Sequence, residues 1–314
     1  MSSASPAPQP MPLDVLCVGH ASYDLIFSVP HHPNPDEKIF ADGFLACGGG
    51  PAANAAVTCA RLGFQAAFGG YLGNDLYGEK HWQELLDEGV CTRFIARGES
   101  PTPISVVLVK PEGRRSLVNY KGETQYTPAE SIDFSTAAPR VMLFDGHEPQ
   151  LSVPLALKAQ AEGIDTVLDA GSLHEGTQAL MHRVDYLVAS EKFARQYLGR
   201  QAEDEALSRL AERAPVVVIT LGERGLIWKR GGERGALPAF PVTAVDTTGA
   251  GDAFHGAFAA AVAAGMPWRD VLRYAGAAGA LCCTKMGARA GLPLQEDVRA
   301  LLERYPDTPI DERG

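Results

Sequence analysis

The stretch Val245-Asp-Thr-Thr-Gly-Ala-Gly-Asp-Ala-Phe254 places a glycine turn and an acidic side chain at the start of an alanine-rich run. That run, residues 253–264, predicts a helix that begins at the turn. Successive backbone N–H groups of such a turn, together with the positive end of the helix, form a binding site for an anion. We expect this site to be lined by the residues of the turn, Gly249, Ala250 and Gly251.

The Asp252 carboxylate would lie at the mouth of this site. A carboxylate cannot bind an anion, but it can take a proton from a hydroxyl while the turn holds a phosphoryl group in transfer. The alternative is an aspartate that only caps the helix. The longer string favours chemistry, because it combines an anion site, a carboxylate and an apolar helix face.

A second glycine run, Gly48-Gly49-Gly50-Pro-Ala-Ala-Asn54, predicts another helix start. Proline in the first turn and Gly63 after Leu62 are typical of the two ends of a helix. Asn54 interrupts the apolar character of this helix, and a buried amide needs hydrogen-bond partners. The run therefore indicates a binding site, although a plain helix start is the alternative.

The order of the expected elements predicts an α/β fold. From residue 139 onward, short apolar runs alternate with helical patterns, which is typical of a mainly parallel sheet with helices on both faces. Segments 22–47 and 100–125 do not fit that sheet, and alternation in 102–120 predicts a β-hairpin. We expect these segments to form a small separate sheet. Residues 1–12 are expected to be a disordered lead-in, and residues 13–314 a single domain.

Composition excludes several classes of function. The chain of 314 residues has a net charge of -10 and no basic block, so it is a poor candidate for binding nucleic acid or an anionic membrane. Its six cysteines form no Cys-x-x-Cys pair and have no histidine cluster beside them, so we expect free thiols and no metal site of protein ligands alone. Without a signal peptide or a long apolar run, the protein is expected to be soluble and cytoplasmic.

The motifs resemble those of the ribokinase-like (PfkB) family of sugar kinases. The string D-T-T-G-A-G-D-x-F is similar to the C-terminal family signature, and Gly49 to Asn54 resembles the N-terminal G-G-x-x-x-N signature. Asp24 follows the first strand, where the family has a substrate-binding aspartate, and Ile219-Thr-Leu-Gly-Glu-Arg-Gly225 resembles its nucleotide loop. These motifs occur in the family's order over about residues 13–295.

The resemblance implies a ribokinase-like fold whose small sheet serves as a lid, and a reaction that uses ATP and Mg²⁺. Asp252 would be the general base, and the backbone of the glycine turn would stabilise the charge that develops on the γ-phosphate. The residues implied in nucleotide binding are Thr220, Gly222, Gly225, Thr247, Gly249 and Gly251. A homodimer through the open face of the lid is also implied. The family's N-x-x-E motif is replaced by Ser190-Glu-Lys-Phe193, which puts magnesium binding at this segment in doubt.

Details of the motifs look closer to the ketohexokinase and sulfofructose kinase branch, which implies a ketohexose or related keto-sugar. The substrate-binding residues implied are Asp24, Lys38, Gly49, Gly50, Asn54, Asn119, His147 and Asp252. Histidine at position 147 stands where the sulfofructose enzyme has arginine, which weakens the case for a sulfonated sugar without closing it. Lys38 could equally be a solvated loop lysine, and His147 a packed residue at a strand end.

Rival classes lack their own motifs in this chain. A Rossmann dehydrogenase requires G-x-G-x-x-G after the first strand, where this chain has Gly19-His-Ala-Ser-Tyr-Asp24. The P-loop string G-x-x-x-x-G-K-[ST] is absent. A non-catalytic sugar-binding protein would have no need of Asp252 beside an anion site. The alternative kept open is a nucleoside kinase of the same fold.

Overall fold

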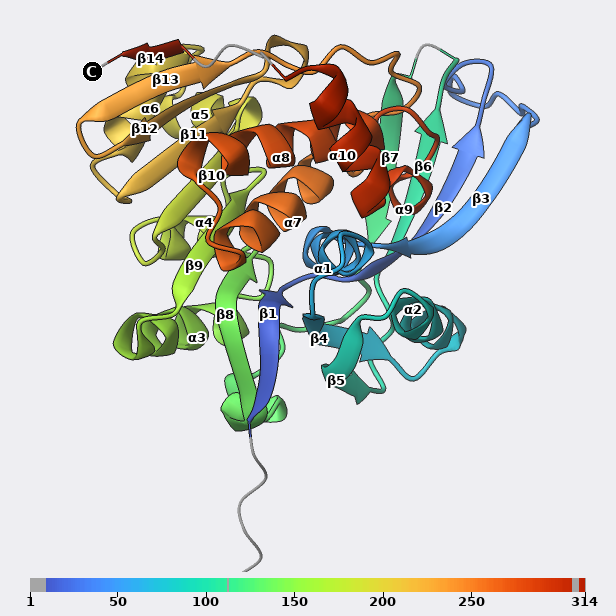
Figure 1. Ribbon diagram of the computed structural model, residues 1–314. Coiled ribbons are helices and arrows are strands. Elements are labelled where there is room, and N and C mark those ends of the chain that lie inside the picture. The colour runs from blue at the N-terminus through green and yellow to red at the C-terminus, as the bar shows by residue number, and fades with distance from the viewer. Residues whose placement is uncertain (1–9, 112, 307–310, 314) are drawn as a thin grey trace, which may run out of the picture.

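A computed structural model describes residues 10–111, 113–306 and 311–313 (Figure 1). Its main feature is a ten-stranded sheet, of which seven neighbouring strands are parallel and the three at one edge are antiparallel. In order across the sheet, the strands are β14 (Asp311–Arg313), β13 (Glu233–Leu237), β12 (Leu226–Arg230), β11 (Val216–Thr220), β10 (Tyr186–Ser190), β9 (Asp165–Ala170), β8 (Ala137–Phe144), β1 (Met11–Val18), β4 (Ala66–Gly73) and β5 (Cys91–Gly98).

Helices cover both faces of this sheet, as the alternating pattern predicts (Figure 1). One face packs against α1 (Pro51–Arg61), α2 (Leu76–Asp87), α7 (Ala250–Ala263), α8 (Trp268–Cys282) and α10 (Gln295–Arg304). The other face packs against α3 (Pro149–Glu162), α4 (Glu175–Leu180), α5 (Glu191–Leu198) and α6 (Glu203–Leu210). The remaining short helices are α9 (Ala288–Gly291), η1 (Ala129–Ser131), η2 (Phe134–Thr136) and η3 (Gly222–Arg224).

Each face has its own hydrophobic core, and β1 shows why. Val15 and Cys17 of this strand belong to one core, whereas Leu16 and Val18 belong to the other. Successive side chains of a strand point to opposite faces, so the part of a strand that is covered on both sides is apolar at successive positions. The continuous apolar run in the sequence is therefore explained by burial on both faces of the sheet.

A second, four-stranded sheet lies apart from the first (Figure 1). Its strands, in order, are β3 (Gly43–Gly49), β2 (Ser22–Ser28), β6 (Ile104–Val109) and β7 (Arg115–Tyr120). The hairpin expected in 102–120 is β6 and β7. One face of this sheet exposes apolar side chains, including Phe44, Val118 and Tyr120. The homodimer through this sheet stays a prediction, which the mass of the protein in solution would test.

The N-terminal boundary differs from the expected lead-in over residues 1–12. Residues 1–9 lie outside the described part of the chain, and β1 already includes Met11 and Pro12. These two residues pair with Ala137 and Ala138 of β8, so a neighbouring strand extends β1 beyond the apolar run. Within the described ranges, no helix is both long enough and apolar enough to cross a bilayer.

Candidate active site

The site lies where the parallel strands end and α7 begins. Gly249 is the residue before α7 and has φ 80°. A Cβ atom at this position would lie 2.5 Å from the Ala288 Cβ atom, so both its conformation and its surroundings require glycine. Asp246 holds the turn, because its buried carboxylate accepts hydrogen bonds from the Thr248 N–H at 2.9 Å and the Gly287 N–H at 2.8 Å.

Asp252 lies in the first turn of α7 and faces a cavity of about 140 Å³. We call this the acidic cavity; it is lined by Asp145, Asp169, Asp252, His147, His174, His255, Thr220 and Gly251, among others. Burial and then the charge of Asp169 raise the pKa of Asp252 to about 7, against the lowering effect of a hydrogen bond from Asn54. A carboxylate with a pKa near 7 is suited to act as a general base at neutral pH.

Asn54 connects the two glycine motifs. Its Nδ2 atom donates a hydrogen bond of 2.8 Å to Asp252 Oδ2, across 198 residues of sequence. The side chain is 2% exposed, and its Oδ1 atom has no partner among the described residues. A buried acceptor without a partner is costly unless a ligand or water supplies a donor. Asn54 therefore offers a free acceptor to a hydroxyl group next to the carboxylate of Asp252.

Asp24 lies beside the glycine run, because β2 and β3 pair along their length. Burial raises its pKa, while a hydrogen bond of 2.9 Å from the Ser22 hydroxyl acts in the opposite direction. A Cβ atom at Gly49 would lie 2.2 Å from Asp24 Oδ2, and one at Gly50, where φ is 95°, would lie 2.5 Å from the His20 carbonyl oxygen. Gly49 therefore lets the backbone approach the Asp24 carboxylate closely, and Gly50 lets it approach the backbone of His20.

Replacing Gly49 with alanine should raise KM for the acceptor about tenfold or more, because the added methyl group must displace the Asp24 carboxylate. Steady-state kinetics at saturating phosphoryl donor would measure this. Gly232→Ala is the matched control, since a Cβ atom at Gly232 would meet nothing within 4 Å. An unchanged KM in a Gly49→Ala protein with normal thermal stability would show that Asp24 does not contact the acceptor.

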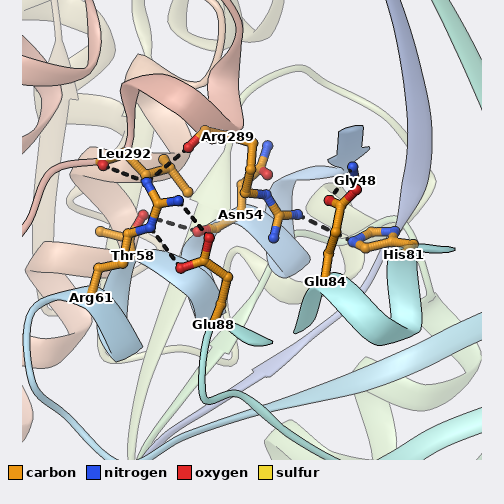
Figure 2. Close-up of polar contacts among 9 residues, drawn as sticks. All are labelled: Gly48, Asn54, Thr58, Arg61, His81, Glu84, Glu88, Arg289 and Leu292. Atoms are coloured by element: carbon orange, nitrogen blue, oxygen red, sulfur yellow. Dashed lines mark hydrogen bonds and ion pairs between the residues drawn. The ribbon is translucent and has the colours of Figure 1, made fainter. Parts of the chain in front are cut away.

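A network of hydrogen bonds and ion pairs holds the start of the glycine run in place (Figure 2). The Gly48 N–H donates to Glu84 Oε2 at 2.6 Å, and Arg289 contacts the buried His81 at 3.2 Å. Arg61 pairs with Glu88 and donates to the carbonyl oxygens of Arg289 and Leu292. The network ties α1, α2 and α9 together and holds the Gly48 backbone at the start of the glycine run (Figure 2).

The other residues expected to bind the sugar lie in different places relative to the site. Asn119 faces the same side of the small sheet as Asp24, because Ser105 pairs with both of them. His147 lies between the rings of His20 and His174, with centroid distances of 5.5 and 4.6 Å, and lines the acidic cavity. Lys38 lies on the exposed loop between β2 and β3, and it is not among the residues that line this cavity.

A larger cavity of about 500 Å³ adjoins the acidic cavity. Its walls are mainly apolar, with Phe240, Phe254 and Ala280 among them, and it also contains Gly222 and Gly225 of the expected nucleotide loop. Thr220 and Gly251 line both cavities, so the two meet beside Asp252. Thr247 and Gly249 do not line the larger cavity; their part is to form the turn.

Sequence reasoning missed Arg115, the first residue of β7. Its Nη1 atom donates a hydrogen bond of 2.6 Å to Thr248 Oγ1, in the glycine turn before α7. Its charge lowers the pKa of both Asp24 and Asp252. The string Gly113-Arg-Arg-Ser116 marks a cation at the hairpin tip, but only the fold shows where that cation points.

Asp145 was also missed, although an acidic residue directly after a buried strand is a detectable signal. It is 2% exposed and accepts hydrogen bonds from the backbone N–H groups of His20 at 2.8 Å, Ala52 at 3.1 Å and His147 at 2.9 Å. One carboxylate thus joins the ends of β1 and β8 to the start of α1. Its role is to hold the walls of the site.

Comparisons with known proteins agree with this geometry. Residues 12–295 match the model of a protein family described as "pfkB family carbohydrate kinase". A ribokinase of Bacillus subtilis (strain 168) is 30% identical over 293 residues, which cover 92% of this chain and 99% of the relative. The crystal structure of ribokinase from Thermotoga maritima is 26% identical, with a TM-score of 0.82 over 93% of this chain and 99% of that one. Arabidopsis thaliana ribokinase complexed with ribose and ATP is also 26% identical, with a TM-score of 0.81 and the same coverage.

These relatives are ribokinases, so the expected ketohexokinase or sulfofructose kinase branch is not confirmed. The expected fold is confirmed in both of its parts, the mainly parallel sheet and the small separate sheet. The chain belongs to the pfkB family of carbohydrate kinases, which are phosphotransferases that act on an alcohol group of a sugar.

Proposed function

We propose that the protein transfers the γ-phosphoryl group of ATP to a primary hydroxyl of a small sugar. The observation that carries the proposal is the contact between Asn54 and Asp252 beside the glycine turn, at the junction of the two cavities. A base, an anion site and a free hydrogen-bond acceptor thus lie together. A protein that only binds sugar would need neither the base nor the anion site.

In this mechanism, the sugar lies between Asp24, Gly49 and Asn54. Asn119 lies on the same side of the small sheet, with Ser105 between it and Asp24. Asp252 accepts the proton of the hydroxyl as its oxygen attacks the γ-phosphoryl group in line. Backbone N–H groups of the glycine turn stabilise the negative charge that develops. The Arg115 guanidinium, which already contacts the turn, adds a positive charge to the same place.

The apolar cavity suits a nucleotide base, and its junction at Thr220 and Gly251 would lead the phosphates toward Asp252. Mg²⁺ usually keeps several waters and is held by substrate phosphates with only one or two carboxylates. The phosphates of ATP would therefore hold most of the ion, since no three His, Cys, Asp or Glu side chains among the described residues are placed to hold a metal ion by themselves. Bound with ATP, Mg²⁺ would neutralise charge on the phosphate oxygens.

We propose ribose as the first acceptor to test, since the Arabidopsis relative is complexed with ribose and ATP. A ketohexose is the second candidate, supported by the similarity of the glycine motifs to ketohexokinase-like enzymes. The three rings of His20, His147 and His174 would contact the far end of either sugar. Burial lowers the pKa of His20 and of His174, so these two rings are neutral at pH 7.

A panel of pentoses, ketohexoses and nucleosides, assayed for ADP formation, tests the proposal. We expect one sugar to be turned over at least tenfold faster, in kcat/KM, than any nucleoside. Asp252→Asn serves as the background for each compound. Turnover of nucleosides without turnover of sugars would replace the proposal with a nucleoside kinase.

A further inference from the structure

A buried histidine and a buried aspartate contact each other beside Asp252. His255 follows it by one helical turn in α7 and is 2% exposed. Its Nδ1 atom lies 3.2 Å from Oδ2 of Asp169, at the end of β9, which is 6% exposed. Neither residue belongs to the motifs that indicated the site, and both line the acidic cavity.

Each nitrogen of the His255 ring faces a backbone carbonyl oxygen, which can only accept a hydrogen bond. Nδ1 lies 2.6 Å from the Gly251 carbonyl oxygen in addition to Asp169, and Nε2 lies 3.2 Å from the Val188 carbonyl oxygen. A neutral imidazole has one N–H group, so one nitrogen would present a lone pair to an oxygen. An imidazolium donates from both nitrogens and satisfies all the contacts. The geometry therefore favours the protonated ring.

Burial acts against charge on either residue taken alone. It lowers the pKa of His255, against the raising effect of the Val188 and Gly251 carbonyls and of the Asp252 charge. Burial, followed by the charge of Asp145, raises the pKa of Asp169 to about 8. An imidazolium beside a carboxylate has no net charge, so the two avoid together much of the cost that each would meet alone.

The charge of Asp169 matters because of what the acidic cavity must accept. Three carboxylates line it, and Asp145 is compensated by its three backbone N–H donors. An uncompensated charge on Asp169 would repel both the Asp252 carboxylate and an incoming phosphoryl group. A phosphoryl-transfer site therefore needs a cation or a proton on Asp169.

We propose that His255 is a positioning residue that, as an imidazolium, neutralises Asp169 and leaves Asp252 as the single uncompensated carboxylate of the acidic cavity. The proposal rests on the proposed function, in which that cavity receives the phosphoryl group. The same ring holds the Gly251 carbonyl, and so fixes the peptide group whose N–H belongs to Asp252.

The test is the alkaline side of the pH profile of kcat. In His255→Asn, Asp169 loses its counter-ion and ionises as the pH rises through about 8, so kcat should fall about tenfold for each further pH unit. The wild type should show no such fall, because the imidazolium compensates the charge. The double variant Asp169→Asn/His255→Asn should also lack it, since no carboxylate remains there. A wild type that falls like His255→Asn, or a double variant that still falls, would overturn the proposal.

Nitrogen NMR of the His255 ring tests the pair without any turnover. Both ring nitrogens should be protonated at pH 7 in the wild type and in Asp252→Asn, and the ring should become neutral in Asp169→Asn. A neutral ring in the wild type would refute the ion pair. Sugar phosphorylation that survives in Asp252→Asn would instead refute the proposed function and leave the NMR result intact, so the two failures are distinguishable.

Discussion

Replacing Asp252 with asparagine should lower kcat about 10³-fold or more, while the affinity for the sugar changes less than about threefold. Asparagine has the same shape and can still accept the hydrogen bond from Asn54 Nδ2, which is 2.8 Å from the present carboxylate. It cannot accept the proton of the attacking hydroxyl. The two effects separate a base from a residue that only binds, and steady-state kinetics with calorimetric titration of the sugar would measure them.

Asp204→Asn is the matched control for this variant. Asp204 also lies in the first turn of a helix, α6, but it is exposed and lines neither cavity. It should leave kcat unchanged. Near-normal turnover in Asp252→Asn would show that the aspartate only caps α7.

The pH profile gives the same test in the native protein. Burial raises the pKa of Asp252 to about 7, and the base works only when ionised. Catalysis should therefore be present above pH 7 and fall about tenfold per unit as the pH drops below 7. Any residual activity of Asp252→Asn should lack this acid limb, whereas an acid limb that persists would belong to another group.

The starts of two helices, and the polar side chains beside them, could be predicted from the sequence, because they depend on residues that are adjacent in the chain. Glycine, proline and the residues that follow them determine where α1 and α7 begin, and this located Asn54 and Asp252. The pairing of distant strands could not be predicted in the same way. The parallel pairing of β2 with β6, and the antiparallel edge of β12, β13 and β14, depend on contacts between segments far apart in the chain.

Residues whose role depends on where the fold brings them were missed. Asp145 is an ordinary acidic residue in sequence, and only the meeting of β1, β8 and α1 gives it three donors. His255 occupies an alanine-rich helix and acquires its partner from β9. Lys38 was expected to bind the sugar through family resemblance alone. It lies on an exposed loop and lines neither cavity, so that role stays a prediction.

Replacing Arg115 with methionine should lower kcat/KM about 10²- to 10³-fold, the range seen when one donor to a developing negative charge is removed. Methionine keeps much of the length of the side chain but loses the guanidinium, and with it the hydrogen bond of 2.6 Å to Thr248. Because the Arg115 charge lowers the pKa of Asp252, its loss should also move the acid limb of the profile to higher pH. Arg115→Lys should restore the position of that limb but only part of the rate, since lysine keeps the charge without the planar fork of donors.

Arg114→Met is the control, because Arg114 is the neighbouring exposed arginine at the same hairpin tip. It should change kcat/KM less than about threefold, since surface charges distant from the chemistry have small effects. The comparison tests the small sheet itself, as Arg115 is the residue by which β7 reaches the glycine turn before α7. If this sheet closes over the sugar, only the loss of Arg115, which contacts the glycine turn, should lower kcat/KM. Equal losses in the two variants would mean that a general positive field acts there, and no loss in either would mean that the glycine turn needs no cation from the small sheet.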